Sequence, residues 1–316
     1  MFTKNSDLLT AAANTIPIQG ISVVMATCNG ATYLRQQLDS ILAQTLQPAE
    51  IIVYDDSSTD ETLQILETYR EQGLLQYFTN TVRLGVIGNF QRAAAAAKPN
   101  NYIAFADQDD IWLPDKLEKA LHAMPANNLQ PCLVYSNLLL IDAEGKQLPG
   151  TAWEVFGYHK YRHCLHTFLF ANFVFGCTTL INSTMREFLM EMPYKGKLNH
   201  DAWLALTAFS LGNAIGITEP LIAYRKHASN VTFDNSQKKS MIARIGRNIR
   251  WLLGTNDPLK EYISMVTLFY NTYQKQLPPH VQRVLRRYLK LNGKPFIVKR
   301  IALEFFFAGK WQGRWR

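Results

Sequence analysis

Residues 21–56 read ISVVMATCNGATYLRQQLDSILAQTLQPAEIIVYDD, and this stretch predicts the fold class. ISVVMAT at 21–27 is uncharged and rich in β-branched residues, as expected of a strand that is buried on both faces. The segment that follows spaces apolar residues such as Leu34 and Leu38 on one helix face, and EIIVYDD at 50–56 is a second strand. A strand, a helix and a strand in this order predict a βαβ unit with parallel strands.

The same alternation continues along the chain. Ser58 and Glu61 have capping-box spacing ahead of a helix predicted at 61–70. Further strands are expected at 74–80, 102–107, 132–142, 173–182 and 214–227, and further helices at 88–97 and 198–212. From about residue 238 the pattern is helical and basic.

These elements predict an α/β protein with a Rossmann-like, mostly parallel sheet flanked by helices and a helical basic extension at the C-terminus. We expect three parts: a leader at 1–19, a catalytic domain at 20–237 and a basic helical region at 238–316. The leader has no sustained apolar run behind a basic start, which argues against a signal peptide.

Charge is distributed unevenly along the 316 residues, whose net charge is +8. Residues 238–316 hold 17 lysines and arginines against 3 acidic residues, whereas the preceding 237 residues hold 16 against 22. The segments 241–254 and 301–316 mix basic residues with large apolar ones, a pattern suited to an anionic membrane surface. An ordinary solvated helix face explains it equally well, and no nucleic-acid-binding module is recognisable, so we expect no nucleic acid partner.

Cysteine usage indicates the compartment. The four cysteines are scattered without metal-ligand spacing, which favours reduced thiols in the cytoplasm. The long uncharged run between Arg162 and Arg186 contains histidine, asparagine and threonine side chains, so it suits a protein interior better than a membrane. We therefore expect a cytoplasmic protein, peripheral at the cytoplasmic face of the membrane.

Five carboxylates follow predicted strands directly: Asp55 and Asp56 after one, and Asp107, Asp109 and Asp110 after another. In a parallel open sheet the ligand site lies beyond the carboxyl ends of the strands, so these groups should meet at one edge. Such a cluster suits Mg²⁺ or Mn²⁺, which commonly bind a few carboxylates together with substrate phosphates. The metal would stabilise a departing diphosphate by neutralising its developing charge.

The segment quoted above, with DDSSTDET and FADQDDIW, resembles the family 2 inverting glycosyltransferases of the GT-A fold, and the likeness covers about residues 20–230. The resemblance implies that Thr27 and Asn29 line the nucleotide pocket and that Asp56 holds the base or ribose. It also implies a D-x-D in which Asp107 lies near the ribose and Asp109 binds the metal. Where the family has a proline after the first strand, this chain has an alanine.

Two further segments extend the resemblance. NHDAW is similar to the family's E-D or H-D-x-W segment, which implies that Asp201 is the catalytic base and that Trp203 walls the acceptor site. AYRKHASNVT looks like a Y-R-x-H-x-x-N-V segment of bacterial rhamnosyltransferase-like members. By that likeness His227 approaches the metal or diphosphate and Arg225 contacts the phosphates.

Structural roles remain open for several of these residues. Asp55 and Asp56 suit an Asx turn or helix cap, and Asp201 suits an N-cap. Asp110 and Asp115 are interpreted as caps of a helix near residue 114. An isolated histidine such as His227 is often a surface or core residue without a ligand.

The predicted function is a metal-dependent inverting glycosyltransferase that transfers a sugar to a hydroxyl of a glycan or lipid-linked glycan in cell-surface polysaccharide synthesis. By the resemblance, the first candidate donor is dTDP-rhamnose and the second a UDP-hexose. The alternatives are a sugar-phosphate nucleotidyltransferase and a non-catalytic nucleotide-sugar-binding relative. A nucleotidyltransferase should carry a glycine-rich loop with a lysine after the first strand, which CNGATYL lacks.

Overall fold

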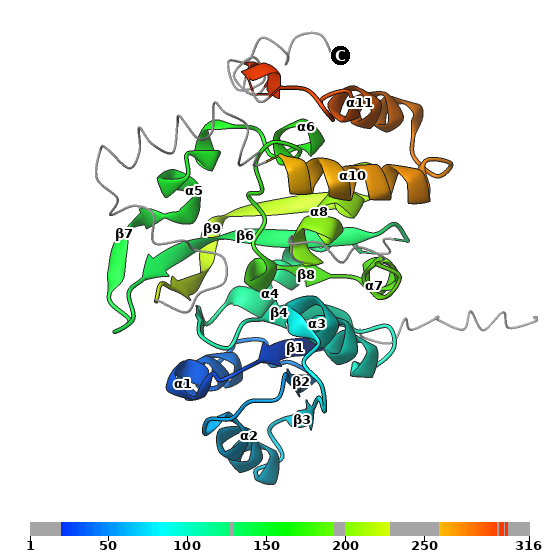
Figure 1. The fold of residues 1–316 in the computed structure, drawn as a ribbon. Helices are drawn as coiled ribbons and strands as arrows, with labels where there is room; N and C mark the ends of the chain where they lie inside the picture. The colour runs from blue at the N-terminus through cyan, green and yellow to red at the C-terminus, as the bar shows by residue number, and fades with distance from the viewer. Residues whose placement is uncertain are drawn as a thin grey trace, which may run out of the picture.

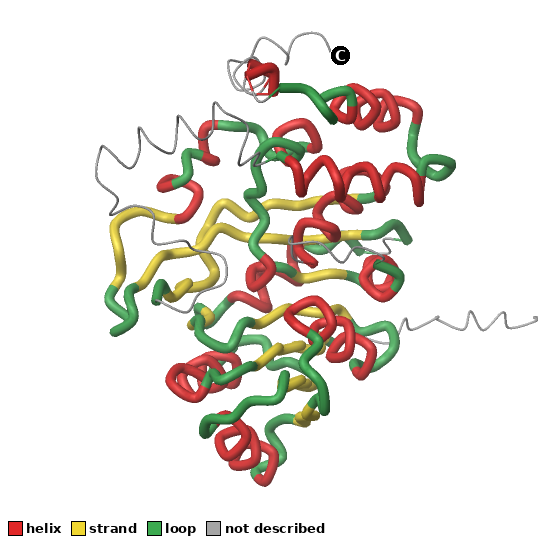
Figure 2. Tube along the Cα trace, viewed as in Figure 1, coloured by secondary structure: helices red, strands yellow, loops and turns green. Residues whose placement is uncertain are grey.

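The computed structural model describes residues 20–126, 129–192, 200–227, 259–295, 297–299 and 301–302. Within these ranges the strands form one mixed sheet in the order β3-β2-β1-β4-β8-β6-β9-β5, with β7 paired to β6. Helices cover both faces of this sheet (Figures 1 and 2). The α/β fold predicted from the sequence is confirmed, although the sheet is mixed rather than mostly parallel.

The N-terminal half of the sheet is parallel and matches the predicted order of elements. Strand β1 pairs with β2 on one side and with β4 on the other, and β2 pairs with β3. The strands are β1 (Ile21–Thr27), β2 (Glu50–Asp55), β3 (Gln76–Thr79) and β4 (Tyr102–Ala106), and the helices between them are α1 (Ala31–Leu42), α2 (Thr62–Glu71) and α3 (Gly85–Ala96). The right-handed crossovers of such units place all four strand ends at one edge.

The second half of the sheet mixes directions. β6 (Cys132–Ile141) runs parallel to β9 (Asn213–Arg225), whereas β8 (Leu180–Ile181) is antiparallel to its neighbours β4 and β6. β5 (Ile111–Trp112) pairs antiparallel with β9, and β7 (Gln147–Thr151) with β6. The shorter helices here are α4 (Lys116–Ala123), α5 (Ala152–Val155), η1 (Tyr158–Lys160), α6 (Leu165–Phe168), η2 (Gly176–Thr178) and α7 (Ser183–Met190).

The strand predicted at 173–182 was largely wrong. Only β8 within it is a strand, and the one-turn helix η2 precedes it. The run is apolar because it is buried in the core, and a short buried run does not distinguish a strand from a turn by its periodicity. This turn nevertheless lies beside the cavity described below.

Two hydrophobic clusters fill the space on either side of the sheet. One includes residues of α1, α2 and α4, and the other joins α3 and α8 (His200–Leu211) to the C-terminal helices α10 (Lys260–Tyr273) and α11 (Pro279–Leu289). Figure 1 shows α10 and α11 on the far side of α8 from α1 and α2. The boundary predicted near residue 237 lies outside the described residues, as do the leader, segment 241–254 and most of segment 301–316.

Two predicted helix caps differ in the structure. α2 begins at Thr62, and the Ser58 hydroxyl donates to Asp55 instead of forming a capping box. Asp115 precedes α4 but makes no side-chain cap; its carboxylate pairs with Lys119 at 2.6 Å. Asp110 is fully buried and belongs to the site described below.

Among the described residues, no helix combines the length and the apolar character that crossing a bilayer requires.

Candidate active site

A cavity of about 590 Å³ opens at the edge where the parallel strands end. Seven of the nine site residues predicted from the sequence line it: Thr27, Asn29, Asp56, Asp107, Asp109, Asp201 and His227. The other two, Arg225 and Trp203, do not. The cavity therefore brings together residues that are up to 200 positions apart in the sequence, from Thr27 to His227.

The end of β1 and the loop after it are held by hydrogen bonds to the end of β2 and to the loop that follows β2. The Thr27 hydroxyl donates to the buried carboxylate of Asp55 at 2.9 Å. Asn29 adopts a left-handed backbone (φ 51°), and its side-chain oxygen accepts from the Thr59 N–H at 2.8 Å. A left-handed conformation is unfavourable for a non-glycine residue unless neighbouring contacts hold it. Asp55 thus supports this loop from within the sheet and does not line the cavity.

Asp56 anchors the segment that leads into α3. Its two carboxylate oxygens accept from the backbone N–H groups of Leu84 at 2.7 Å and Gly85 at 2.8 Å, and one also accepts from the side chain of Asn80 at 3.0 Å. Hydrogen bonds to a carboxylate from several N–H donors fix its orientation. Asp56 therefore has a structural task in shaping the cavity wall, in addition to any contact with a nucleotide.

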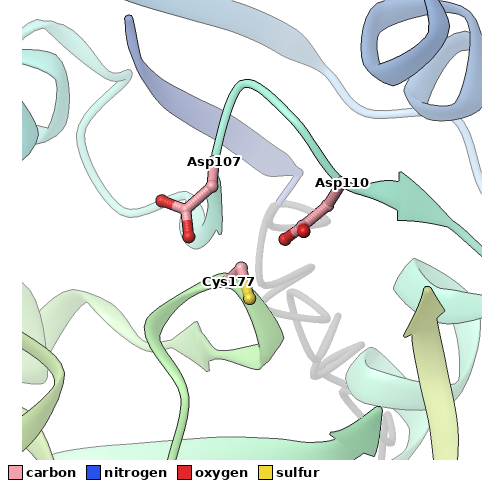
Figure 3. A group of neighbouring side chains, drawn as sticks. All are labelled: Asp107, Asp110 and Cys177. Carbon is pink, nitrogen blue, oxygen red and sulfur yellow. The ribbon is translucent and has the colours of Figure 1, made fainter. Parts of the chain in front are cut away.

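The loop 107–110 carries the acidic centre. Carboxylate oxygens of Asp107 and Asp110 and the Cys177 sulfur lie within 4.8 Å of one another, and Figure 3 shows the three side chains gathered between this loop and η2. Burial, together with the nearby charges of Asp109 and Asp201, raises the pKa of Asp107 to about 7. Enclosed carboxylates that repel one another are stabilised in their charged form by a cation.

Asp109 and His227 form a pair at the cavity wall, with Asp109 Oδ2 and His227 Nε2 2.8 Å apart. With Asp107, they offer oxygen donors and one imidazole nitrogen to the same space. A donor set dominated by carboxylates suits Mg²⁺ or Mn²⁺, and the imidazole favours the transition metal Mn²⁺. Asp110 is fully buried and accepts from the Arg225 backbone N–H at 3.2 Å, so it lies behind this donor set.

Asp201 lies in the first turn of α8 and lines the cavity, so it comes from a helix and not from a strand end. Burial raises its pKa to about 6, although hydrogen bonds from the Ala202 and Gly176 N–H groups act in the opposite direction. A carboxylate with this pKa is mostly ionised near neutral pH and still accepts a proton readily. The N-cap alternative for Asp201 does not explain its position on the cavity wall.

The structure places Arg225 and Trp203 elsewhere than expected. Arg225 is 1% exposed, and its guanidinium bonds to backbone carbonyls and to the Gln36 side chain rather than facing the cavity. Trp203 is fully buried and packs against Phe269 and Tyr273 of α10. Its indole ring is therefore part of the core and cannot form a wall of this cavity.

Sequence reasoning missed several residues that line the cavity. Among the described residues, Arg83 is the one arginine or lysine on its wall, and it is exposed. Gln108 joins two loops, since its side chain accepts from the Cys28 N–H at 2.8 Å and donates to the Cys28 carbonyl at 3.2 Å. Gly30 permits this contact, because a Cβ there would lie 2.2 Å from the Gln108 amide oxygen. The sequence signal that could have identified Gln108 as a cavity residue was its position between the two aspartates of the D-x-D.

Comparison with known proteins gives a family match for the N-terminal half of the chain. Residues 22–167 match the family model described as Glycosyl transferase family 2. The chain is 29% identical over 213 residues to an uncharacterized glycosyltransferase of Rickettsia prowazekii, an alignment that covers 67% of this chain and 65% of that protein. It is 26% identical over 213 residues to the Escherichia coli UDP-Glc:alpha-D-GlcNAc-diphosphoundecaprenol beta-1,3-glucosyltransferase WfgD, covering 67% and 79%.

A shorter match links the chain to the dTDP-rhamnosyl transferase RfbG of Shigella flexneri, with 37% identity over 109 residues. This match covers 33% of the chain and 38% of RfbG.

Two solved structures share the fold. S. aureus TarS 1–349 in complex with UDP-GlcNAc superposes with a TM-score of 0.56 at 15% identity, covering 93% of this chain and 92% of that one. The mannosyltransferase PcManGT from Pyrobaculum calidifontis, in complex with GDP-Man and Mn²⁺, gives 0.52 at 16% identity and covers 92% and 81%. Residues 22–167 thus match a glycosyltransferase family 2 domain, the described residues have a GT-A-like fold, and the chain spans 65% of the length of the Rickettsia prowazekii relative.

Proposed function

We propose that this chain is a glycosyltransferase, that it is metal-dependent, and that it inverts the anomeric configuration of the sugar that it transfers. The observation that carries the proposal is that Asp107, Asp109 and Asp201 line one cavity, where burial and the charges of the other two raise the pKa of Asp107. A metal-binding carboxylate and a candidate base thus act on the same enclosed space. This arrangement suits a diphosphate leaving group held close to an attacking hydroxyl.

Asp107, Asp109 and His227 would hold the divalent cation, which neutralises the charge that develops on the departing diphosphate. Asp201 accepts the proton of the acceptor hydroxyl while the hydroxyl oxygen bonds to the anomeric carbon. The bond from that carbon to the diphosphate breaks, and its electron pair leaves with the diphosphate. Asp201 comes from α8 rather than from the strand ends, which supports a position on the face opposite the leaving group.

Arg83 takes the phosphate-binding role first given to Arg225. It lines the cavity, whereas the Arg225 guanidinium is enclosed by backbone carbonyls. Arginine suits this task because its planar group presents several N–H donors to phosphate oxygens. The sequence argument against the nucleotidyltransferase alternative is the loop CNGATYL after β1, which lacks the glycine-rich, lysine-containing pattern that holds a triphosphate.

The donor that we propose first is dTDP-rhamnose, and a UDP-hexose is second. The similarity to the dTDP-rhamnosyl transferase RfbG supports the former, and the similarity to the UDP-Glc-dependent WfgD and to TarS with bound UDP-GlcNAc supports the latter. The acceptor is a hydroxyl of a glycan or a lipid-linked glycan, in keeping with the diphosphoundecaprenol-linked acceptor in the name of WfgD.

We also propose that the basic C-terminal region, residues 238–316, holds a catalytic domain at 20–237 against the cytoplasmic face of the membrane. α11 and the residues after it expose the cations Arg283, Arg286, Arg287, Lys290 and Lys294. Beyond them Ile297, Val298 and Ile301 are each 40–49% exposed. Clustered cations beside exposed apolar side chains suit anionic headgroups and the acyl boundary below them.

The test of function is a transfer assay with dTDP-rhamnose, UDP-glucose and UDP-GlcNAc, each with Mn²⁺ or with EDTA, on a panel of glycan acceptors. Nuclear magnetic resonance of the product gives the anomeric configuration. We expect one donor to react only with Mn²⁺ and the product to have the configuration opposite to the donor. Equal rates in EDTA would refute the metal requirement, and a retained configuration would refute the single-displacement mechanism.

The membrane contact has a separate test. Sedimentation with vesicles of phosphatidylserine and phosphatidylcholine should be lost in the variant Arg283→Glu/Arg286→Glu/Lys290→Glu and should fall with salt. Equal sedimentation of both proteins would refute this surface.

A further inference from the structure

Arg225, the last residue of β9, makes an unusually complete set of contacts for a side chain that is 1% exposed. Its Nε donates to the carbonyl of Asp109 at 3.0 Å, and Nη1 donates to the carbonyl of Ala143 at 3.0 Å. Nη2 donates to the side-chain oxygen of Gln36 at 2.5 Å. The guanidinium therefore joins three separate segments: the loop 107–110, the turn after β6 and helix α1.

The same residue also holds Asp110 and packs on an aromatic ring. Its backbone N–H donates to Asp110 Oδ1 at 3.2 Å. Its guanidinium lies 4.5 Å from the centre of the Tyr33 ring, and that ring contacts the imidazole of His227 with ring centres 5.0 Å apart. Arg225 thus supports both members of the Asp109–His227 pair, one through a backbone carbonyl and the other through Tyr33.

Strand pairing also fixes the C-terminal end of the loop 107–110. β5 follows Asp110 directly and pairs with β9, with Ile111 opposite Ala223. His227 lies two residues beyond Arg225, so the last residue of β9 supplies the clamp on the loop, and the segment directly after β9 supplies the imidazole that contacts Asp109 Oδ2. A change in the guanidinium contacts therefore moves the two donor groups relative to each other.

We propose that Arg225 is a positioning residue that sets the geometry of Asp109 and His227 for a divalent cation. This inference rests on the proposed function, since it assumes that these two side chains bind the metal. The three bonds need the planar fork of N–H donors that a guanidinium presents. A lysine ammonium is a compact point charge and does not replace it. Loss of an outer partner of a metal ligand typically weakens metal binding by about 10- to 100-fold.

The test measures Mn²⁺ binding, not activity alone. Free Mn²⁺ is followed by electron paramagnetic resonance during titration into the full chain with UDP or dTDP, whichever the wild type binds more tightly. We expect Arg225→Lys to weaken Mn²⁺ binding by about 10- to 100-fold. Nucleotide affinity measured in EDTA should be unchanged, because the guanidinium does not line the cavity.

Arg186→Lys is the matched control. Arg186 also donates to two backbone carbonyls, those of Lys98 and Ala95, but it does so away from the cavity. Its substitution should cost similar local hydrogen bonds and leave Mn²⁺ affinity within twofold of the wild type. Gln36→Leu is a second probe if Arg225→Lys does not fold, because Gln36 is exposed on α1 and contributes one of the three bonds. It should weaken Mn²⁺ binding several-fold.

Three results would overturn the inference. Mn²⁺ affinity within twofold of the wild type in both Arg225→Lys and Gln36→Leu would show that the clamp does not position the metal site. Equal losses in Arg225→Lys and Arg186→Lys would show a general effect of destabilisation. A loss of nucleotide affinity in EDTA would show direct contact with phosphate. A wild-type chain that binds nucleotide without any Mn²⁺ effect would instead refute the proposed function itself.

Discussion

The two walls of the cavity are built in different ways. The wall formed by the ends of β1, β2 and β4 is held by hydrogen bonds between side chains and neighbouring backbone, as Asp56 and Gln108 illustrate. The wall formed by η2 and the start of α8 is held by packing of aromatic rings, such as Phe90 and Phe105 against His200. The first wall is suited to fixed recognition of a polar donor, and the second encloses the groups that exchange protons.

This difference explains the titration behaviour of the second wall. Burial raises the pKa of Asp201 to about 6 and lowers the pKa of His200 to about 3. Both changes favour the neutral form, as expected where apolar groups replace water. Enclosure thus makes a base available near neutral pH at one residue and keeps its neighbour uncharged.

The largest expected effect is on transfer and concerns Asp201. Asp201→Asn removes the proton acceptor from the second wall, so the transfer rate should fall by about 10²- to 10⁴-fold. Donor affinity should be retained because the first wall is unchanged. Pre-steady-state transfer and calorimetric donor binding measure the two quantities, and near-normal turnover would exclude Asp201 as the base.

Next in size is the effect of Trp203 on stability. Trp203→Ala should lower the free energy of unfolding by about 3–5 kcal/mol, because it leaves a cavity between α8 and α10. Trp203→Phe should keep the acceptor KM of the wild type, since the indole does not line the cavity. Chemical denaturation and acceptor titrations test these two expectations. A large rise in the acceptor KM of Trp203→Phe would instead support the predicted role of Trp203 in acceptor binding.

The pH profile tests the enclosure of Asp201 directly. The carboxylate must be ionised to accept a proton, so kcat/KM should fall about tenfold per pH unit as the pH drops below about 6. The acid limb should vanish in the residual activity of Asp201→Asn. A limb that persists unchanged in this variant would assign it to another group.

Gly30 probes the hydrogen-bonded wall. Gly30→Ala places a methyl group where the Gln108 amide lies, which breaks the two bonds between Gln108 and Cys28. We expect a loss of about 1–3 kcal/mol in donor binding or stability. Gln108→Ala should cost a similar amount, and the double variant should cost little more than either single one. Additive losses would show that the two residues act separately.

The smallest expected effect at neutral and alkaline pH concerns His200, whose ring nitrogens have no hydrogen-bond partner within the described part of the chain. His200→Phe removes a buried unpaired polar group and should raise stability by about 1 kcal/mol at pH 8. The folded pKa of about 3 lies below the ordinary 6.5, so the unfolded wild type takes up a proton first as the pH falls.

The advantage of His200→Phe should therefore grow between pH 6.5 and pH 3, by up to about 1.4 kcal/mol per unit. Urea denaturation at several pH values measures it, and an advantage that does not depend on pH would show that His200 is not held neutral.

The sequence predicted the hydrogen-bonded wall better than the packed one. Buried parallel strands are short apolar runs with clear ends, so the meeting of Thr27, Asp56 and Asp109 at one sheet edge follows from the strand limits, whereas their roles were implied by the family resemblance. α8 is different, because nine of its 12 residues are buried and its apolar residues surround the whole helix. Periodicity therefore does not reveal that Asp201 faces the cavity whereas Trp203 faces α10.

Long-range partners account for the other differences. The guanidinium of Arg225 bonds to residues 36, 109 and 143, and no local pattern encodes that combination. Cys177 reaches the acidic centre through a one-turn helix inside an apolar run, where Gly176 is a weak sign of a turn in the sequence. Asp110 was interpreted as a cap because it precedes a helix, but tertiary contacts bury it.

The most direct test of the metal-centred site is calorimetric binding of UDP and dTDP to the wild type and to Asp109→Asn, each with Mn²⁺ and with EDTA. The wild type should bind one nucleotide at least about tenfold more tightly with Mn²⁺, and Asp109→Asn should lose that difference while its affinity in EDTA is kept. An equal response to Mn²⁺ in the two proteins would contradict a metal held by Asp109.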